Sequence, residues 1–230
     1  MSFSMSATSA TPTVRRKPYG GVQMEGPLAR WYAQITRDRR DHLRTAQAIA
    51  AQLPSGSAVL EVAPGPGYMA VELAKLGAYR ITGLDISHSF VRIAAENARR
   101  AGVTIDFRHG DVAQMPFPAE SFDFVTCTAA FKNFPDPVAA LDEIHRVLRP
   151  GARASIFDMR KDASREAINQ EVREMRLSPP SAFMTRWVFR LGLLRAAYTR
   201  QALEAVVARS RFGLGEIIQD GIGFELRLIK

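Results

Sequence analysis

The chain has 230 residues, 47% of them hydrophobic, so it is long enough to bury one sizeable core and a single domain is expected. No run of about 18 apolar residues exists, and residues 1–13 lack an apolar signal core, so we expect a cytoplasmic protein without stable membrane insertion. Its single cysteine, Cys127, excludes a disulfide framework within the chain and lies in an apolar run typical of a packed strand.

The net charge of +8 is spread unevenly along the chain. Residues 1–60 carry +5 and residues 158–230 carry +4, whereas residues 61–157 carry −1. A nearly neutral centre with basic flanks is typical of a basic rim around an active site or of a solvated surface. Because no RNA- or DNA-binding motif accompanies the charge, we expect no nucleic-acid partner.

The N-terminal part of the chain is predicted to form a tail and a cap. Residues 1–18 have the composition of a disordered tail. Residues 19–56 are expected to be a helical cap, in which the segment from Leu28 to Leu53 forms one or two helices before Pro54-Ser55-Gly56 stops them. Trp31 and Tyr32 are expected there either as core contacts of the helix or as part of a pocket wall.

Strands and helices then alternate. The predicted strands are Ala58–Val62, Tyr79–Leu84, Thr104–His109, Phe122–Cys127 and Ala152–Asp158, and the helices between them are Tyr68–Leu76, Ser87–Ala101 and Asp136–Leu148. Strands joined by helices of this length imply right-handed crossovers and a parallel sheet covered on both faces. We therefore expect an α/β, doubly wound, Rossmann-like fold whose core spans residues 57–160.

Residues 161–230 are expected to be a helical lid insertion followed by a C-terminal helix and a hairpin. Helices are predicted near 163–176, 181–195 and 200–209. Two apolar runs, Leu214–Gln219 and Gly223–Ile229, flank Asp220-Gly221 and predict an antiparallel hairpin. With these two strands the sheet has seven strands and is mostly parallel.

The segment from Val59 to Gly67 is an apolar strand that runs through an acid into a glycine-bearing turn. Glycine allows a tight turn, and the free N–H groups of the helix that follows favour a nucleotide-like ligand. Gly65-Pro66-Gly67-Tyr68-Met69-Ala70 fits the pattern G-x-G-x-x-A, and Asp85 follows 18 residues after Gly67, so a dinucleotide is formally one candidate.

Four further motifs follow at the ends of the predicted strands. They are Gly83-Leu84-Asp85-Ile86-Ser87, Gly110-Asp111-Val112 with Met115-Pro116-Phe117, Ser121-Phe122-Asp123-Phe124-Val125, and Arg146-Val147-Leu148-Arg149-Pro150-Gly151. In this order the chain resembles the class I S-adenosylmethionine-dependent methyltransferases from about Ala58 to Asp158 and again in the final hairpin. Ala63 departs from that family's first glycine, and Pro64 and Pro66 remove two N–H donors from the loop.

The resemblance implies S-adenosyl-L-methionine as cofactor and no metal. A carboxylate at Asp85 can accept both ribose hydroxyl groups, and Asp111 can accept the adenine amino group while the Val112 amide donates to a ring nitrogen. The alternative for both acids is to cap the next helix or turn. The cofactor residues implied are Glu61, Ala63, Gly65, Gly67, Asp85, Ile86, Asp111, Val112 and Thr128.

The acceptor is expected at the carboxyl ends of the fourth and fifth strands. Lys132 and Asn133 are the candidates for positioning it in catalysis, and Lys132-Asn133-Phe134 is locally similar to a signature of the ubiquinone and menaquinone C-methyltransferases. A dedicated base is needed only if the acceptor loses a proton. The predicted acceptor pocket contains Tyr19, Tyr32, Phe131 and Arg160.

The preferred interpretation is methyl transfer to a small, hydrophobic or aromatic molecule. Quinone C-methylation is the alternative within the family, and a nicotinamide-dependent oxidoreductase and a non-catalytic cofactor-binding or RNA-associated protein are the others. An apolar stripe with adjacent arginines over residues 183–195 indicates a lid helix, or else a helix that touches a membrane surface. The sequence leaves the oligomeric state open.

Overall fold

The computed structural model describes residues 24–37, 40–174, 183, 194 and 196–230. Its strands are β1 (Ala58–Val62), β2 (Arg80–Asp85), β3 (Asp106–His109), β4 (Phe122–Thr128), β5 (Leu148–Met159), β6 (Glu216–Asp220) and β7 (Gly223–Ile229). Its α-helices are α1 (Gly26–Thr36), α2 (Arg40–Ala50), α3 (Tyr68–Leu76), α4 (His88–Ala101), α5 (Pro137–Val147), α6 (Arg165–Glu174) and α8 (Arg200–Arg209), with short 3-10 turns η1 (Val112–Gln114) and η2 (Phe131–Asn133).

The seven strands form one sheet in the order β3-β2-β1-β4-β5-β7-β6. The pairs from β3 to β5 are parallel, and β7 pairs antiparallel with both β5 and β6. The predicted fold class is therefore confirmed, including the antiparallel hairpin at the C-terminal end. Because the chain reverses direction of winding between β1 and β4, a crevice opens at the carboxyl ends of these two strands.

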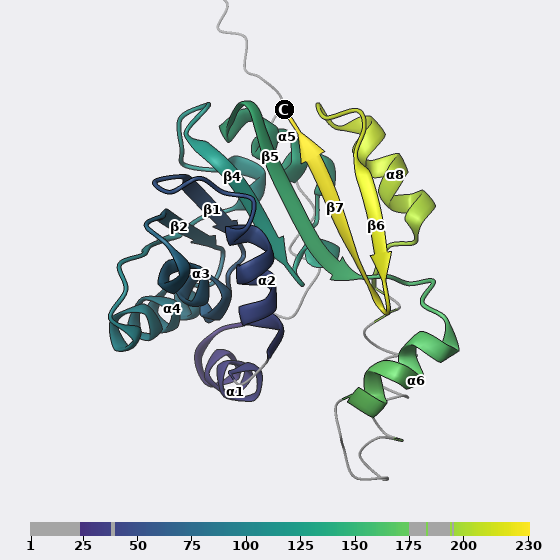
Figure 1. Ribbon diagram of the computed structural model, residues 1–230, viewed down its shortest axis with the longest axis horizontal. Coiled ribbons are helices and arrows are strands. Elements are labelled where there is room, and N and C mark those ends of the chain that lie inside the picture. The colour runs from purple at the N-terminus through teal and green to yellow at the C-terminus, as the bar shows by residue number, and fades with distance from the viewer. Residues whose placement is uncertain (1–23, 38–39, 175–182, 184–193, 195) are drawn as a thin grey trace, which may run out of the picture.

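Helices cover both faces of the sheet (Figure 1). On one face Ile49 of α2 and Leu73 of α3 pack against Val59 and Phe124. On the other face α5 and α8 bury their apolar sides against the central strands. The α6 helix lies beyond the carboxyl edge, where Ile168 packs in a separate small core.

Several element ends differ from the predicted ones. β3 starts at Asp106 instead of Thr104, and β5 starts at Leu148 and passes through the predicted turn at Pro150-Gly151. Leu148 pairs with Phe122, and the register then shifts before Phe124, so the turn residues are accommodated as an irregularity within the strand. The predicted tail and most of the predicted helix over 181–195 lie outside the described residues, and the predicted domain boundaries stay predictions.

Candidate functional site

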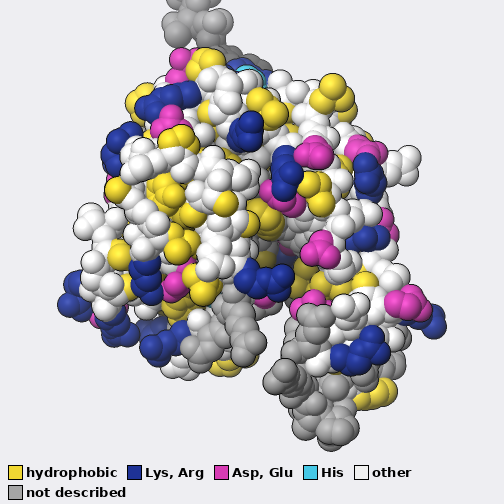
Figure 2. All heavy atoms as spheres, in the orientation of Figure 1, with side chains coloured by type: hydrophobic (Ala, Val, Ile, Leu, Met, Phe, Trp, Pro, Cys, Tyr) yellow, Lys and Arg dark blue, Asp and Glu magenta, His cyan; other side chains and the backbone are white. Residues whose placement is uncertain are grey.

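A cavity of about 1300 Å³ runs along the carboxyl edge of the sheet. Its walls are the loops that follow β1, β2, β3 and β4, the helices α1, α2 and α6, and the β6–β7 turn. Figure 2 shows a hollow between the side of the molecule that carries α2 and the part that carries α6. The cavity therefore joins the glycine loop to the region in which the sequence places an acceptor.

The loop after β1 lines this cavity with backbone in the left-handed region. Ala63, Gly65 and Gly67 have φ values of 52°, 54° and 76°. A Cβ added at Gly67 would approach Ala94 and Phe107 to 2.8 Å, so glycine is needed there for the close packing of α3 against α4 and β3. Gly65 has open space where a Cβ would be, which leaves its backbone accessible to a ligand.

Glu61 is the last residue but one of β1, and only 2% of it is exposed. Its Oε2 atom has no hydrogen-bond partner among the described residues, although the side chain borders the cavity. Burial raises the pKa of Glu61 to about 8, and the nearby charge of Asp85 adds to this rise, while the Ala70 amide opposes it. A buried carboxyl oxygen without a partner is costly, so this atom is suited to a cationic or hydrogen-bond-donating ligand group.

Asp85 lies at the carboxyl end of β2 and ties two loops together. Its Oδ2 accepts the Gly65 N–H at 2.9 Å and its Oδ1 accepts the Ser87 N–H at 2.8 Å. Burial raises the pKa of Asp85, and these two amides act in the opposite direction. The helix cap expected as an alternative role belongs to Ser87, whose hydroxyl accepts the Phe90 N–H. A carboxylate has about four acceptor positions, so Asp85 retains capacity for a ligand.

The loop after β3 forms the neighbouring wall of the cavity. Asp111 accepts the Ala113 N–H at 2.9 Å and begins η1, so the alternative role as a turn cap is present here, and its side chain also borders the cavity. Ile86 is 46% exposed and lines the same wall. The His109 Nε2 donates to the Ile86 carbonyl at 3.1 Å, and its ring stacks on His88 outside the cavity lining.

The structure brings most of the sequence-predicted site residues to this one cavity. Those that border it are Glu61, Ala63, Gly65, Asp85, Ile86, Asp111, Val112 and Thr128 from the predicted cofactor set, and Tyr32 and Asn133 from the acceptor set. Gly67 lies behind the loop rather than in the wall, and Tyr19 lies outside the described residues. The roles of these residues in binding the cofactor and the acceptor stay predictions.

Lys132 does not present its ammonium group to the cavity. Its Nζ donates to the Asp158 Oδ1 and to the Ala129 carbonyl, both at 2.8 Å, and its backbone N–H donates to the Asp158 Oδ2 at 2.9 Å. The two side chains are 10% and 0% exposed. The ion pair thus fastens η2 to the end of β5, so any influence of Lys132 on an acceptor acts through the position of the loop.

Two predicted acceptor-pocket residues are corrected by the structure. Phe131 is fully buried and packs against Phe134 and Tyr198 in the main core, because η2 turns this ring inward. Arg160 pairs with Asp162 at 2.9 Å and does not border the cavity. Trp31, expected as a core or pocket residue, is neither, since it is 55% exposed.

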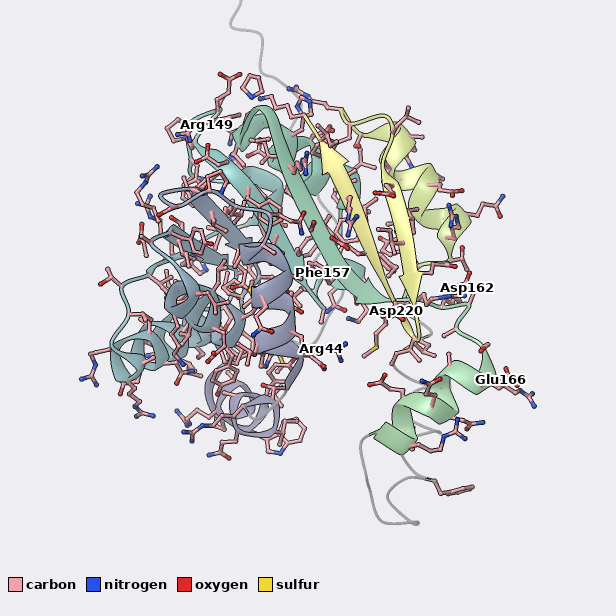
Figure 3. All side chains as sticks on the ribbon, viewed as in Figure 1. Arg44, Arg149, Phe157, Asp162, Glu166 and Asp220 are labelled. Carbon is pink, nitrogen blue, oxygen red and sulfur yellow. The ribbon has the colours of Figure 1, made fainter. Side chains whose placement is uncertain are left out.

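The cavity is also lined by residues that no sequence motif predicted. Arg44 of α2, Phe157 of β5 and Glu225 of β7 all border the cavity. Figure 3 shows Arg44 and Asp220 on opposite sides of the hollow, from α2 and from the end of β6. The alternation of side chains in β7 places Glu225 on one face of the strand, but the sequence gives no sign that this face borders a cavity.

Comparison with known proteins supports the interpretation of this site. Residues 60–156 match the profile of a family described as a methyltransferase domain. The chain thus contains a segment that is similar to methyltransferase domains. The matched segment runs from β1 into β5 and includes Glu61, Asp85, Asp111 and Thr128.

Curated relatives resemble this methyltransferase domain over part of their length. A 2-phytyl-1,4-naphtoquinone methyltransferase of Synechococcus elongatus is 36% identical over 113 residues, which are 47% of this chain and 48% of the relative. A demethylmenaquinone methyltransferase of Deinococcus radiodurans is 37% identical over 122 residues, which are 53% of this chain and 51% of the relative. The chain thus spans about half the length of the curated relatives it matches.

Solved structures resemble the domain over nearly its whole length. A SAM-dependent methyltransferase from Aquifex aeolicus has a TM-score of 0.68 at 18% identity, covering 87% of this chain and 97% of the other. An S-adenosylmethionine-dependent methyltransferase structure from Methanococcus maripaludis has a TM-score of 0.69 at 21% identity, covering 96% and 97%. At this identity the likeness shows the fold.

The polar groups that line the cavity fit S-adenosylmethionine. Glu61 offers a buried carboxyl oxygen without a partner among the described residues, and the open backbone at Gly65 leaves room beside it. Asp85 and Asp111 offer further acceptors along the same cavity. Within the described part of the chain, no helix is both long and apolar enough to cross a membrane.

Proposed function

We propose that the protein is a methyltransferase that uses S-adenosylmethionine to methylate a small, hydrophobic or aromatic molecule. One observation carries the proposal: a single cavity of about 1300 Å³ is lined both by the acids of the cofactor motifs and by residues of the β4 loop and the C-terminal hairpin. The matched domain, the methyltransferase relatives and the fold support it.

Within this proposal, four groups hold the cofactor. The Glu61 carboxyl group faces the ammonium group of the amino-acid end, and Asp85 accepts the ribose hydroxyl hydrogens while it keeps the Gly65 loop in place. Asp111 and the Val112 amide face the adenine, beside the apolar side chain of Ile86. S-adenosylmethionine supplies an electrophilic methyl group on a sulfonium centre.

The chain's remaining contribution is to hold an acceptor in line with that methyl group and to exclude water. Asn133 and Phe157 border the same cavity as the cofactor motifs. The Thr128 Oγ1 atom is buried and has no hydrogen-bond partner among the described residues, so it is free to orient a polar group of a bound ligand. Apolar walls at Phe157 and Ile218 favour a flat or hydrophobic molecule.

Quinone-type C-methylation is the second candidate function. The relatives named as naphthoquinone and demethylmenaquinone methyltransferases favour it, as does the Lys132-Asn133-Phe134 stretch. A nicotinamide-dependent dehydrogenase receives no such support, because the matched domain and the named relatives are methyltransferases.

A turnover assay tests the function directly. Protein is incubated with cofactor that carries a labelled methyl group and with a panel of phenols, thiols, amines and reduced quinones. Transfer to at least one of these acceptors is expected, and transfer confined to a reduced quinone would select the second candidate. No transfer to any member, together with no cofactor binding by calorimetry, would contradict the proposal.

The substitution Asp85→Ala tests the cofactor assignment. It removes the acceptor proposed for the ribose and also the anchor of the Gly65 and Ser87 amides, so cofactor affinity is expected to fall by roughly a hundredfold or more. Calorimetric titration measures the affinity, and circular dichroism checks folding. Asp106→Ala, at an exposed acid on the neighbouring strand β3, is the matched control and should bind normally. Near-normal binding by Asp85→Ala would refute the assignment.

A further inference from the structure

The α1 helix turns its large apolar side chains to the outside. Ala29, Ala33 and Thr36 are buried, whereas Leu28, Trp31 and Ile35 are 36%, 55% and 56% exposed. At about 100° per residue, the three exposed side chains lie on one side of the helix, opposite the three buried ones. Small residues therefore pack this helix on the domain, and its bulky apolar face has no partner within the described residues.

Basic side chains accompany this apolar face. Arg30 lies within α1 and Arg37 follows it, and both are exposed. The helix itself contains no acidic residue, and the carboxylate of Glu25, just before it, accepts the Ser89 N–H and so faces α4. At about 100° per residue, the two arginines lie on the polar side of the helix, between Ala33 of its buried side and Trp31 of its apolar side. A helix with tryptophan and aliphatic residues on one face and arginines on its polar face is typical of segments that lie in the interface of an anionic bilayer.

The same helix is a wall of the methyltransferase cavity. Tyr32 and Thr36 border the cavity, and Tyr32 follows Trp31 and precedes the exposed Ile35 by one helical turn. The outward apolar face and the cavity-lining face are thus neighbouring sides of one short helix. A surface that held the apolar face would also lie beside the cavity.

We propose that the face formed by Leu28, Trp31 and Ile35, with Arg30 and Arg37, docks on an anionic lipid bilayer. The apolar side chains enter the interface and the arginines pair with lipid phosphates. The docking itself does not depend on the proposed function. Delivery of a lipid-dissolved acceptor to the cavity does rest on it, and would make the acceptor a membrane-soluble molecule.

Vesicle co-sedimentation of the full chain tests the docking, without cofactor or acceptor. Binding is expected to vesicles of phosphatidylglycerol mixed with phosphatidylcholine, and to be much weaker with phosphatidylcholine alone. The variant Trp31→Asp/Ile35→Asp should lower the partition coefficient by roughly tenfold or more, because interfacial binding scales with buried apolar area. Leu214→Asp, at an 85% exposed leucine elsewhere, is the matched control and should bind like the wild type.

Tryptophan fluorescence reports the site of docking. The chain has two tryptophans, so Trp187→Phe leaves Trp31 as the single reporter, and brominated lipid tails should quench it. Absence of anionic vesicle binding, or equal binding by Trp31→Asp/Ile35→Asp, would overturn the proposal. Self-association in sedimentation velocity without lipid, abolished by the same variant, would overturn it too and assign the face to a second copy of the chain.

A separate measurement keeps the docking distinct from the enzyme activity. With a detergent-solubilised acceptor found in the panel, Trp31→Asp/Ile35→Asp should turn over at the wild-type rate, since these exposed side chains do not border the cavity. A lost rate in this variant would show that the face acts on the cavity itself, which would contradict the proposed delivery and leave the methyltransferase function standing.

Discussion

Two buried acids at neighbouring strand ends determine the character of this site at the scale of residues. Glu61 lies next to the end of β1 and Asp85 ends β2. Burial raises the pKa of each acid, and the charge of Asp85 raises the pKa of Glu61 further. Asp85 uses two backbone amides to offset its burial, whereas Glu61 keeps one oxygen without a partner among the described residues. Burying this oxygen without a partner costs folding free energy, and a ligand group that binds it can offset that cost.

The first prediction concerns the pH dependence of stability through Glu61. In the folded protein its pKa is about 8, above the ordinary value of 4.5, so between these values the folded chain holds a proton that the unfolded chain has lost. The contribution of Glu61 to stability is complete below pH 4.5 and is lost as pH rises towards 8, by at most about 1.4 kcal/mol per pH unit.

Urea unfolding of the wild type and of Glu61→Gln at pH 5, 6, 7 and 8 measures this contribution. Glutamine has no proton to lose, so the wild type should weaken relative to the variant as pH rises. Glu166→Gln, at an exposed position on α6, is the control and should follow the wild type (Figure 3). Parallel curves for the wild type and Glu61→Gln would show that the pKa of Glu61 is ordinary.

At the scale of elements, the loops after β1 and β4 share a construction. Each begins with an alanine in the left-handed region, Ala63 at φ 52° and Ala129 at φ 58°, and both residues border the cavity. Such backbone costs about 1 kcal/mol for a residue with a Cβ, so the surrounding bonds must hold it. The Ala63 N–H donates to the Leu84 carbonyl, and the Ala129 N–H donates to the Phe157 carbonyl.

The second prediction concerns the ion pair that fastens the β4 loop. Lys132→Met leaves the buried Asp158 carboxylate without its cation, which should destabilise the domain by about 3 kcal/mol or more. The double variant Lys132→Met/Asp158→Asn should recover part of that loss, because no charge then remains buried. Urea unfolding gives the three free energies of unfolding.

Kinetics separate the structural effect of this pair from an effect on the site. If the pair positions the loop that carries Asn133, the double variant should raise the KM for the acceptor more than the KM for the cofactor. Lys75→Met removes an exposed pair with Glu72 and should cost less than about 1 kcal/mol. Equally small losses in the free energy of unfolding for Lys75→Met and Lys132→Met would show that the buried ion pair does not stabilise the β4 loop.

At the scale of the whole molecule, the strand order creates the site. The reversal between β1 and β4 brings the ends of β1, β2 and β4 to one crevice, and the hairpin of β6 and β7 extends the same edge towards α6. A ligand in this crevice contacts loops that are far apart in sequence, so its binding stabilises the folded domain as a unit.

The third prediction uses this coupling to decide between cofactors. S-adenosylmethionine at a hundred times its Kd should stabilise the fold by about 2.7 kcal/mol and raise the Tm by roughly 5–10 °C. NAD at the same concentration should leave the Tm unchanged. Differential scanning fluorimetry checks both, and Asp85→Ala should lose the shift. A shift with NAD and none with S-adenosylmethionine would favour the dinucleotide alternative.

The sequence by itself determined the fold class and the location of the cofactor motifs, because both depend on local patterns. Alternation of apolar runs with helical periods specified the parallel strands, and the acids Glu61, Asp85 and Asp111 stand at or just after the carboxyl ends of these runs. Element ends were less certain, as at Pro150-Gly151, which β5 accommodates as an irregularity between its pairs with Phe122 and Phe124.

Tertiary structure alone decided what each side chain near the acceptor does. Lys132 resembled an acceptor ligand in sequence, but the end of β5 supplies Asp158, and a buried cation must pair with the acid that the fold places beside it. Phe131 and Trp31 are both aromatic residues of the predicted pocket region, yet one is buried and the other faces outward. The local periodicity of the sequence indicates which residues share one side of a helix or strand. Only the packing of elements that are distant in sequence decides whether that side faces the core, the cavity or the surface.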